Sequence, residues 1–278
     1  MIHIKDAIYD RISVRTYEKK ILSQDEKHQI DEMISSVKES KGPFGHQINY
    51  FVTHQKDVSD EEAKRIGTYG FIKNASSFVG GTITNTLHAM VDYGYLFEEL
   101  ILKLTQCGFA TCWLAGTFDR KAFSHYINGD LMIPAITPIG YPEDSMSLRE
   151  RAIRFAIKAN RRNPFKDMFF LCDISHPLHE KTDHPLKLAF ELVQLGPSAS
   201  NKQPWRLIAD DSIIHFYLER TPNYGVNRPF VIQALDIGIA LKHFEIGLHE
   251  LKKLFHYMVM EHPNPKTFEY IISIVIDK

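Results

Sequence analysis

The string of this sequence richest in groups able to bind a ligand is GPSASNKQPW, at residues 196–205. Two small hydroxyl side chains, Ser198 and Ser200, stand beside Asn201, and the string ends in Pro-Trp. Hydroxyl and amide groups gathered in one turn can donate several hydrogen bonds to a phosphate or a polyhydroxyl ligand. Serine, asparagine and proline are also the usual residues of loops, so composition alone leaves a plain helix-to-strand loop open.

A second string, RISVRTY at residues 11–17, alternates cationic and hydroxyl side chains. In an extended backbone Arg11, Ser13 and Arg15 would point to one face, which would place two guanidinium groups around one hydroxyl. That arrangement suits a phosphate dianion, although a solvated basic stretch is the ordinary interpretation of such residues. Arg162, in the basic pair of RRNPF, could add to this charge or could lie in a solvated linker.

A third string, CGFATCWLAG at residues 107–116, is almost entirely apolar. Gly108 would end a preceding helix, and Ala115-Gly116 closes the string with small residues. Small residues let a flat ring approach the main chain and accept hydrogen bonds from backbone N–H groups. Taken by itself, such a string is more often a buried strand.

Hydrophobic periodicity predicts the elements that would position these strings. Ser23, followed three residues later by Glu26, forms a capping box that opens a helix over residues 24–39. Residues 109–116 are predicted as a short strand or extended loop, and 147–166 as a helix and connector. Further helices are predicted over 85–107, 118–127, 185–195 and 230–251, and strands over 48–55, 78–84, 133–142, 205–210, 213–219, 256–260 and 268–276.

The order of elements repeats along the chain. Asp92-Tyr-Gly in the first long helix matches Asp236-Ile-Gly in the second, and GPFGHQ at 42–47 matches the start of the string at 196–203. We interpret this order as a diverged duplication, with a first half at 1–165 and a second half at 166–278. Because strands are separated by hairpin loops and by long helices, the sequence predicts an α+β fold with mixed or antiparallel sheets.

Composition excludes several classes of function. The 278 residues are 44% hydrophobic with a formal net charge of −1, which predicts a folded core and no field to attract nucleic acid. No apolar run is long enough to span a membrane, and charged residues interrupt the first residues where a signal peptide needs an apolar stretch, so we expect a cytoplasmic protein. The three cysteines, Cys107, Cys112 and Cys172, are expected to be reduced thiols.

The three strings together resemble the nitroreductase family. In that family an N-terminal Arg-x-Ser-x-Arg binds the phosphate of FMN, a Pro-Ser-x-x-Asn-x-Gln-Pro-Trp turn contacts the flavin, and a Gly-x-x-Thr-x-Trp segment runs beside the isoalloxazine ring. A late Arg-x-Pro segment, which follows a Gly-Tyr-Pro, returns an arginine to the phosphate. The resemblance implies that FMN is bound by these residues: Arg11, Ser13, Arg15, Trp113, Leu114, Ala115, Gly116, Arg162, Pro197, Ser198, Ala199 and Asn201.

One departure points to a particular branch of the family. Ordinary members are homodimers that complete each flavin site with residues of both subunits. Here the first half keeps the arginine motif and the Trp113 segment, whereas the turn at 42–47 has diverged, and the second half keeps the other turn without a second Arg-x-Ser-x-Arg. The chain therefore resembles the fused, internally duplicated branch, a monomer that acts as a pseudodimer with one FMN.

The activity that the resemblance implies is NADH- or NADPH-dependent reduction of a small acceptor, such as a nitroaromatic or a quinone, by a ping-pong flavin mechanism with no catalytic side chain and no metal. A flavin-binding or flavin-sensing protein without turnover is the main alternative. A metal-dependent hydrolase would rest on His176, His179 and His184, but their spacing does not fit a helical zinc pair. The sequence leaves open the acceptor, the choice of nucleotide, and whether residues 56–75 form a lid.

Overall fold

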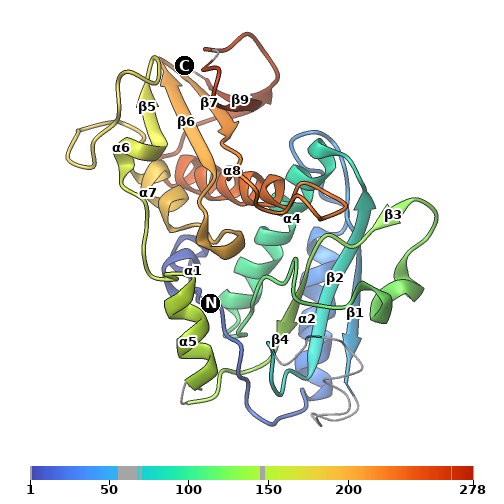
Figure 1. Ribbon diagram of the computed structural model, residues 1–278. Helices are drawn as coiled ribbons and strands as arrows, with labels where there is room; N and C mark the ends of the chain where they lie inside the picture. The colour runs from blue at the N-terminus through green and yellow to red at the C-terminus, as the bar shows by residue number, and fades with distance from the viewer. Residues whose placement is uncertain (1, 56–67, 69–70, 145–147, 264, 278) are drawn as a thin grey trace.

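The computed structural model describes residues 2–55, 68, 71–144, 148–263 and 265–277 (Figure 1). Its architecture is α+β, as predicted, with two sheets on either side of two long helices. No helix among these residues is both long and apolar enough to cross a membrane. The helices are α1 (Ile4–Asp10), α2 (Gln24–Val37), α4 (Leu87–Gln106), α5 (Leu148–Ala156), α6 (Phe165–Met168), α7 (Lys187–Leu195) and α8 (Ile232–Glu250), with 3₁₀ turns η1 (Arg120–Tyr126) and η2 (Ala199–Asn201).

The first sheet is built around β2 (Ser77–Thr84), which is buried along nearly its whole length. β1 (Asn49–His54), β3 (Leu131–Met132) and β4 (Ile136–Ile139) each pair with β2 in the antiparallel direction. β3 and β4 follow each other along one side of β2, because β4 pairs near its start and β3 near its end. This sheet confirms the strands predicted around residues 48–55, 78–84 and 133–142.

The second sheet has the strand order β5-β6-β7-β9-β8. β6 (Trp205–Asp210), β7 (Ile213–Leu218), β9 (Glu269–Ile276) and β8 (Phe255–Met258) pair antiparallel, and a short connection joins β6 to β7. β5 (Phe169–Leu171) pairs with β6 in the parallel direction and makes the sheet mixed. The sequence does not predict β5, since a three-residue strand carries no periodicity to recognise.

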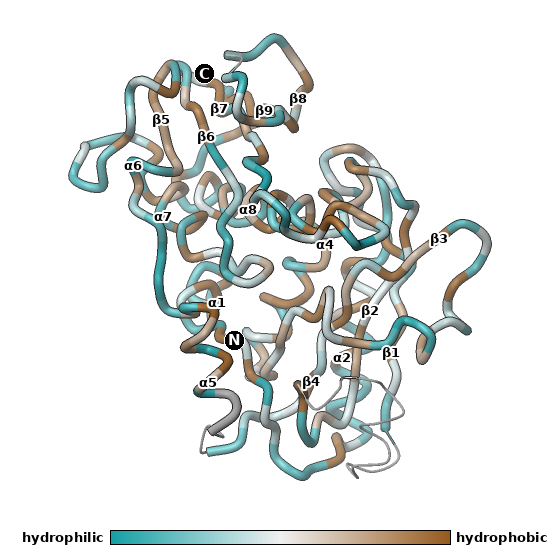
Figure 2. Tube along the Cα trace, viewed as in Figure 1, coloured by the Kyte–Doolittle hydropathy of each residue, from teal (hydrophilic) through white to brown (hydrophobic). Residues whose placement is uncertain are grey.

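The long helices α4 and α8 cross in the centre of the molecule, between the two sheets (Figure 1). The repeated Asp-x-Gly motifs lie at this crossing. A Cβ on Gly94 would overlap the carbonyl oxygen of Leu235, and a Cβ on Gly238 would overlap that of Val91, so only glycine lets the two backbones touch. Figure 2 shows the hydrophobic residues concentrated along these two helices and hydrophilic residues along the outer loops.

Two further elements, α1 and η1, differ from the sequence prediction. α1 is a helix that the sequence did not reveal, because His3 offers no side-chain cap and the segment is short. Its buried residues Ala7 and Ile8 pack on α4, α7 and α8, so tertiary packing stabilises it. The amphipathic helix predicted at 118–127 is the 3₁₀ helix η1, capped by Asp119, whose carboxylate accepts a hydrogen bond from the Lys121 N–H.

Candidate functional site

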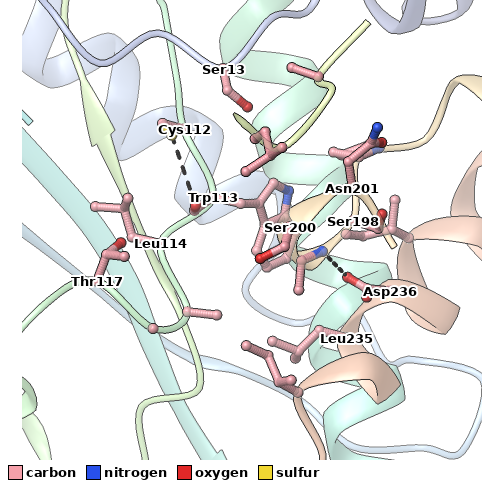
Figure 3. Close-up of a pocket in the computed structure, with 18 of the residues that line it drawn as sticks. Ser13, Cys112, Trp113, Leu114, Thr117, Ser198, Ser200, Asn201, Leu235 and Asp236 are labelled. Carbon is pink, nitrogen blue, oxygen red and sulfur yellow. Dashed lines mark hydrogen bonds between the residues drawn. The ribbon is translucent and has the colours of Figure 1, made fainter. Parts of the chain in front are cut away.

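A pocket of about 250 Å³ lies where the two halves of the chain meet. Figure 3 shows Ser13 and Trp113 from the first half and the turn residues Ser198 and Asn201 from the second half around one space. Every residue predicted to bind the ligand lines this pocket: Arg11, Ser13, Arg15, Trp113, Leu114, Ala115, Gly116, Arg162, Pro197, Ser198, Ala199 and Asn201. The structure therefore brings together segments that are up to 190 residues apart, which is the separation of Arg11 and Asn201 (201 − 11).

The arginine segment at 11–15 enters the pocket in an extended form, held on both sides by backbone hydrogen bonds. The N–H of Val14 donates to the carbonyl oxygen of Thr111 at 3.0 Å, and Ser13 forms a parallel bridge with the same residue. The N–H of Lys73 donates to the carbonyl oxygen of Arg15 at 2.9 Å. This backbone explains why alternate residues of the segment line one pocket, as their spacing predicts.

Buried cationic groups without partners lie at this end of the pocket. Among the described residues, nothing accepts a hydrogen bond from Nη1 of Arg11 or from Nε of Arg162, and both atoms are buried. Burial lowers the pKa of Arg162, and the nearby positive charges of Arg11 and Arg154 lower it further. Buried donors that carry charge and lack an acceptor are costly in the absence of an anion, so this end is built to receive one.

The turn at 196–203 is shaped by contacts inside the second half. Asp236, on α8, accepts a hydrogen bond from the N–H of Ala199 at 2.9 Å (Figure 3). The hydroxyl of Ser198 accepts one from the N–H of Gln203 at 2.9 Å. Ser200 adopts φ near +50°, a conformation that non-glycine residues rarely adopt, and its hydroxyl accepts from the Tyr224 hydroxyl at 2.9 Å. The turn is thus held in a strained shape around the pocket.

Asn201 lines the pocket, but its polar atoms already bond to the protein. Its Nδ2 donates to the carbonyl oxygens of Lys158 at 2.7 Å and Arg161 at 2.9 Å, and its Oδ1 lies 3.4 Å from Nη1 of Arg162. The side-chain oxygen of Gln203 accepts from the N–H of Asn163 at 2.9 Å in the same region. Both amides therefore tie the turn to the connector at 157–164 and keep Arg162 at the pocket.

Trp113 is positioned by a buried network that joins the two long helices. Its Nε1 donates to Oε2 of Glu98 on α4 at 2.7 Å, and Oε1 of the same carboxyl lies 2.9 Å from Nε2 of His243 on α8. Nδ1 of His243 lies 2.8 Å from the carbonyl oxygen of Leu192, and because that oxygen only accepts, Nδ1 carries the hydrogen. Glu98 and His243 are almost completely buried.

The segment after Trp113 presents main chain to the pocket. Leu114 pairs with Ile136 of β4 through two backbone hydrogen bonds, which fixes the segment against the first sheet. Among the described residues, no group accepts a hydrogen bond from the N–H of Ala115 or Gly116. Apolar side chains from other elements also line the pocket: Ile153, Ile157, Ile232, Leu235 and Ile239.

Several lining residues were missed by the sequence analysis. Tyr224 and Arg228 come from the loop between β7 and α8, which carries no motif. Asp236 was noted only as part of the repeated Asp-x-Gly, and its second oxygen, Oδ2, is buried without a partner. Burial raises the pKa of Asp236 well above its ordinary value, while the N–H of Ala199 lowers it. The repeated Asp-x-Gly motif marked Asp236 as a matched position of the two halves, but it did not indicate that Asp236 lines a pocket.

The diverged turn at 42–47 does not contribute to the pocket. Its partner in the first half is Asp92, whose Oδ1 accepts from the N–H of Phe44 at 3.0 Å. Its Oδ2 accepts from the N–H of His46 at 2.9 Å and lies 2.8 Å from Nδ1 of the same residue. Both oxygens of Asp92 are therefore used by the turn itself.

The remaining candidates from the sequence lie apart. Nδ1 of His176 is 3.0 Å from the Asp173 carboxylate, whereas Nδ1 of His184 accepts from the N–H of Leu186. In the described part of the chain, no three His, Cys, Asp or Glu residues gather closely enough to hold a metal ion. Of the segment considered as a lid, residues 56–67 and 69–70 lie outside the described residues, whereas Phe71 lines the pocket.

A family model and a solved structure each match almost the whole chain. A family model described as "Putative TM nitroreductase" matches residues 3–248. A structure from Thermotoga maritima MSB8 named "putative nitroreductase" has a TM-score of 0.63 at 21% identity and covers 99% of this chain and 94% of that chain, so the fold is shared from end to end. No curated protein matches the sequence.

Other solved structures resemble about half of the chain. A nitroreductase family protein from Clostridium novyi NT has a TM-score of 0.41 at 18% identity and covers 51% of this chain and 87% of that chain. A nitroreductase with bound FMN from Bacteroides fragilis NCTC 9343 has a TM-score of 0.41 at 16% identity and covers 53% of this chain and 92% of that chain.

Proposed function

The chain belongs to the nitroreductase family whose model matches it, and from this membership we propose that it is an FMN-dependent oxidoreductase with one flavin site built from both halves. The single observation that carries the proposal is the pocket itself. Every residue that the family resemblance assigns to FMN lines one cavity, although those residues come from four separate segments of the chain.

The cationic end of the pocket fits the phosphate of FMN. Arg11, Arg15 and Arg162 approach it from two segments around Ser13. The buried Nη1 of Arg11 and Nε of Arg162 lack partners among the described residues, and a phosphate dianion would accept hydrogen bonds from both. One guanidinium group can donate two hydrogen bonds to the oxygens of a phosphate, so several arginines can surround one phosphate group.

The rest of the pocket fits the ribityl chain and the flat ring. Ser198 is in place to contact the ribityl hydroxyls, and Trp113, Leu235 and Ile239 offer apolar surface to a ring system. Asn201 would hold the turn in place rather than donate to the ligand, because its amide hydrogens are already directed to the carbonyl oxygens of Lys158 and Arg161. The available N–H groups of residues 115 and 116 would donate to the polar edge of the ring, where negative charge gathers on reduction.

When bound, FMN would supply two-electron chemistry, in which NADH or NADPH delivers a hydride and leaves before a nitroaromatic or quinone acceptor enters. The residues of the chain would bind and orient the two reactants in turn. Trp113 is held by Glu98 and His243, so its ring keeps one orientation at the pocket. Solvent can supply the protons, so this proposal assigns no catalytic acid or base.

We also propose that the chain is a pseudodimer that works as a monomer, with halves at 1–165 and 166–278. The Asp-x-Gly motifs of the two long helices meet at one crossing, and each aspartate accepts hydrogen bonds from a turn of its own half. This repeated relation supports a duplication within one polypeptide. A second candidate function, flavin binding without turnover, is supported by the divergence of the other turn, because one site has already been lost.

The test is reconstitution of the purified protein with FMN, followed by absorbance spectra and by NADH and NADPH oxidation with a quinone. We expect a yellow protein with turnover above that of free FMN. Arg11→Gln and Arg162→Gln should each weaken FMN binding by about tenfold, since each removes one charge-assisted contact. Arg161→Gln removes an exposed charge next to Arg162 and serves as the matched control.

A protein that takes up no FMN would contradict the proposal. A yellow protein without turnover would favour the flavin-binding alternative. Equal loss of FMN from Arg161→Gln and Arg162→Gln would show that general charge, rather than the buried arginine, governs the affinity. Thermal unfolding of each variant separates weak flavin binding from loss of the fold.

A further inference from the structure

A fourth arginine lies at the pocket, apart from the three that surround Ser13. Arg228 belongs to the loop between β7 and α8, is exposed, and lines the pocket. Its Nη2 lies 3.5 Å from the carbonyl oxygen of Gly116. A Cβ on Gly116 would overlap the guanidinium group, so the glycine allows this arginine to pack directly against the main chain.

Arg120 lies close to Arg228 and contacts the same segment. Its Nη2 donates to the carbonyl oxygens of Ala115 at 2.7 Å and Pro134 at 2.9 Å, and its Nε donates to that of Ile133 at 2.9 Å. Burial lowers the pKa of Arg120, and the positive charge of Arg228 lowers it further. The two guanidinium groups are therefore near enough to repel each other.

No acidic side chain of the described residues forms an ion pair with either arginine. Asp236 is the one acid among the described residues of the pocket lining, and burial raises its pKa well above the ordinary value, which favours the neutral acid. Two like charges placed close together repel each other, and a ligand of opposite charge reduces that repulsion. An anionic group bound at Arg228 would supply that opposite charge.

This second cationic region is distinct from the one around Ser13. Ser13 bridges Thr111, whereas Arg228 contacts Gly116, five residues further along the same segment (116 − 111). In the proposed function the phosphate of FMN is held by Arg11, Arg15 and Arg162. The phosphate of FMN is therefore placed away from Arg228.

We propose that Arg228, reinforced by the nearby charge of Arg120, binds an anionic group, a carboxylate or a phosphate, on the substrate that enters the flavin site. The inference rests on the proposed function and narrows it to anionic substrates. Such a group could belong to the acceptor or to the nucleotide, because NADPH carries a phosphate that NADH lacks. Arg228 would then set specificity, and the flavin would still perform the chemistry.

The experiment uses the FMN-loaded protein and does not depend on turnover. Benzoate and its uncharged analogue benzamide are titrated separately, with the flavin absorbance as the signal. We expect benzoate to bind more tightly than benzamide, and Arg228→Gln to weaken benzoate by about tenfold, since a charge-assisted contact is lost. Arg220→Gln removes an arginine that pairs with Glu269 away from the pocket, and it should leave benzoate binding unchanged.

Two kinetic ratios then identify the source of the anion. The first compares kcat/KM for 4-nitrobenzoate with that for 4-nitrotoluene, and the second compares NADPH with NADH. A fall of the first ratio in Arg228→Gln assigns the anion to the acceptor, and a fall of the second assigns it to the nucleotide. Reversal of the charge in Arg228→Glu should lower the same ratio further.

Equal binding of benzoate and benzamide, or benzoate binding unchanged in Arg228→Gln, would overturn the inference while leaving FMN uptake and the proposed function intact. Absence of FMN uptake is a different result, because it removes the proposed function and the inference with it. If the Arg228→Gln variant keeps its FMN, the fold and the flavin site have survived the substitution.

Discussion

The two turns that match each other in the sequence are held by matching aspartates, yet the structure completes them differently. In the first half both oxygens of Asp92 accept hydrogen bonds, from the N–H groups of Phe44 and His46 and from the His46 ring. In the second half Asp236 accepts one bond, from Ala199, and its other oxygen is buried without a partner. One turn is satisfied by its own residues, and the other borders the pocket.

Backbone conformation shows the same contrast. The first turn contains a single residue at positive φ, Gly45, for which that conformation is favourable. The second turn places Ser200, Asn201 and Gln203 at positive φ, although none of them is glycine. Unsatisfied and strained groups collect where a ligand site is built, because evolution retains them there against their cost in stability. The comparison thus separates a turn whose groups are satisfied from a turn that borders the pocket with strained residues and an unpartnered oxygen beside it.

The largest difference is expected when a methyl group is added to the first glycine of each turn. A Cβ on Gly42 would overlap the carboxyl group of Asp92, whereas a Cβ on Gly196 would meet its nearest atom, the Val193 carbonyl oxygen, at 3.0 Å. Gly42→Ala should lower the free energy of unfolding by about 3 kcal/mol and Gly196→Ala by about 1 kcal/mol. Urea unfolding measures both, and equal losses would show that the turns pack alike.

A smaller difference is expected from removing each aspartate charge. In Asp92→Asn an NH₂ group would face at least one of the N–H groups now bonded to the carboxylate, which should cost about 2 kcal/mol near neutral pH. Asp236→Asn keeps the acceptor for Ala199 and changes only an unpartnered atom, so it should cost less than about 1 kcal/mol. If Asp236→Asn proved the more damaging, Oδ2 would have a partner in solution and the contrast would fail.

The third difference concerns pH. Because burial raises the pKa of Asp236 well above 3.8, the folded protein keeps a proton that the unfolded chain releases. Stability should therefore fall as pH rises through the window between 3.8 and the raised pKa, by at most about 1.4 kcal/mol per pH unit. Asp236→Asn should lose this part of the slope, and the part due to Asp92, whose pKa burial also raises, should remain.

The control for that measurement is Asp210→Asn, which removes an exposed carboxyl at the end of β6. Unfolding free energies of the three proteins at several pH values give the slopes directly. Parallel curves for Asp236→Asn and the unmodified chain would mean that Asp236 is not the buried acid that its surroundings indicate.

Local signals allowed much of the fold to be predicted. The Ser23 capping box places the start of α2 at the residue expected, because the cap and its Glu26 partner lie within one turn. Long periodic runs likewise gave α4 and α8. Helix α1 and strand β5 escaped prediction because the contacts that stabilise them join residues far apart in the sequence.

The site divides in the same way. The strings around Ser13, Trp113 and Ser198 were found because each concentrates its chemistry within a few residues, and the structure brings all three to one pocket. Their role in binding FMN stays a prediction. Arg228 could not be found from the sequence because it lies in a loop without a motif. The unpartnered oxygen of Asp236 could not be found because the lack of a hydrogen-bond partner is a property of the folded structure.

The crossing of α4 and α8 at the Asp-x-Gly motifs sets the relative position of the two sides of the pocket. Since α4 and α8 touch backbone to backbone within one polypeptide, the groups on either side of the ligand share an effective concentration that does not change with dilution. A site shared between separate subunits comes apart when protein is scarce. Here the meeting of the two sides of the pocket is intramolecular, so dilution of the protein does not separate them.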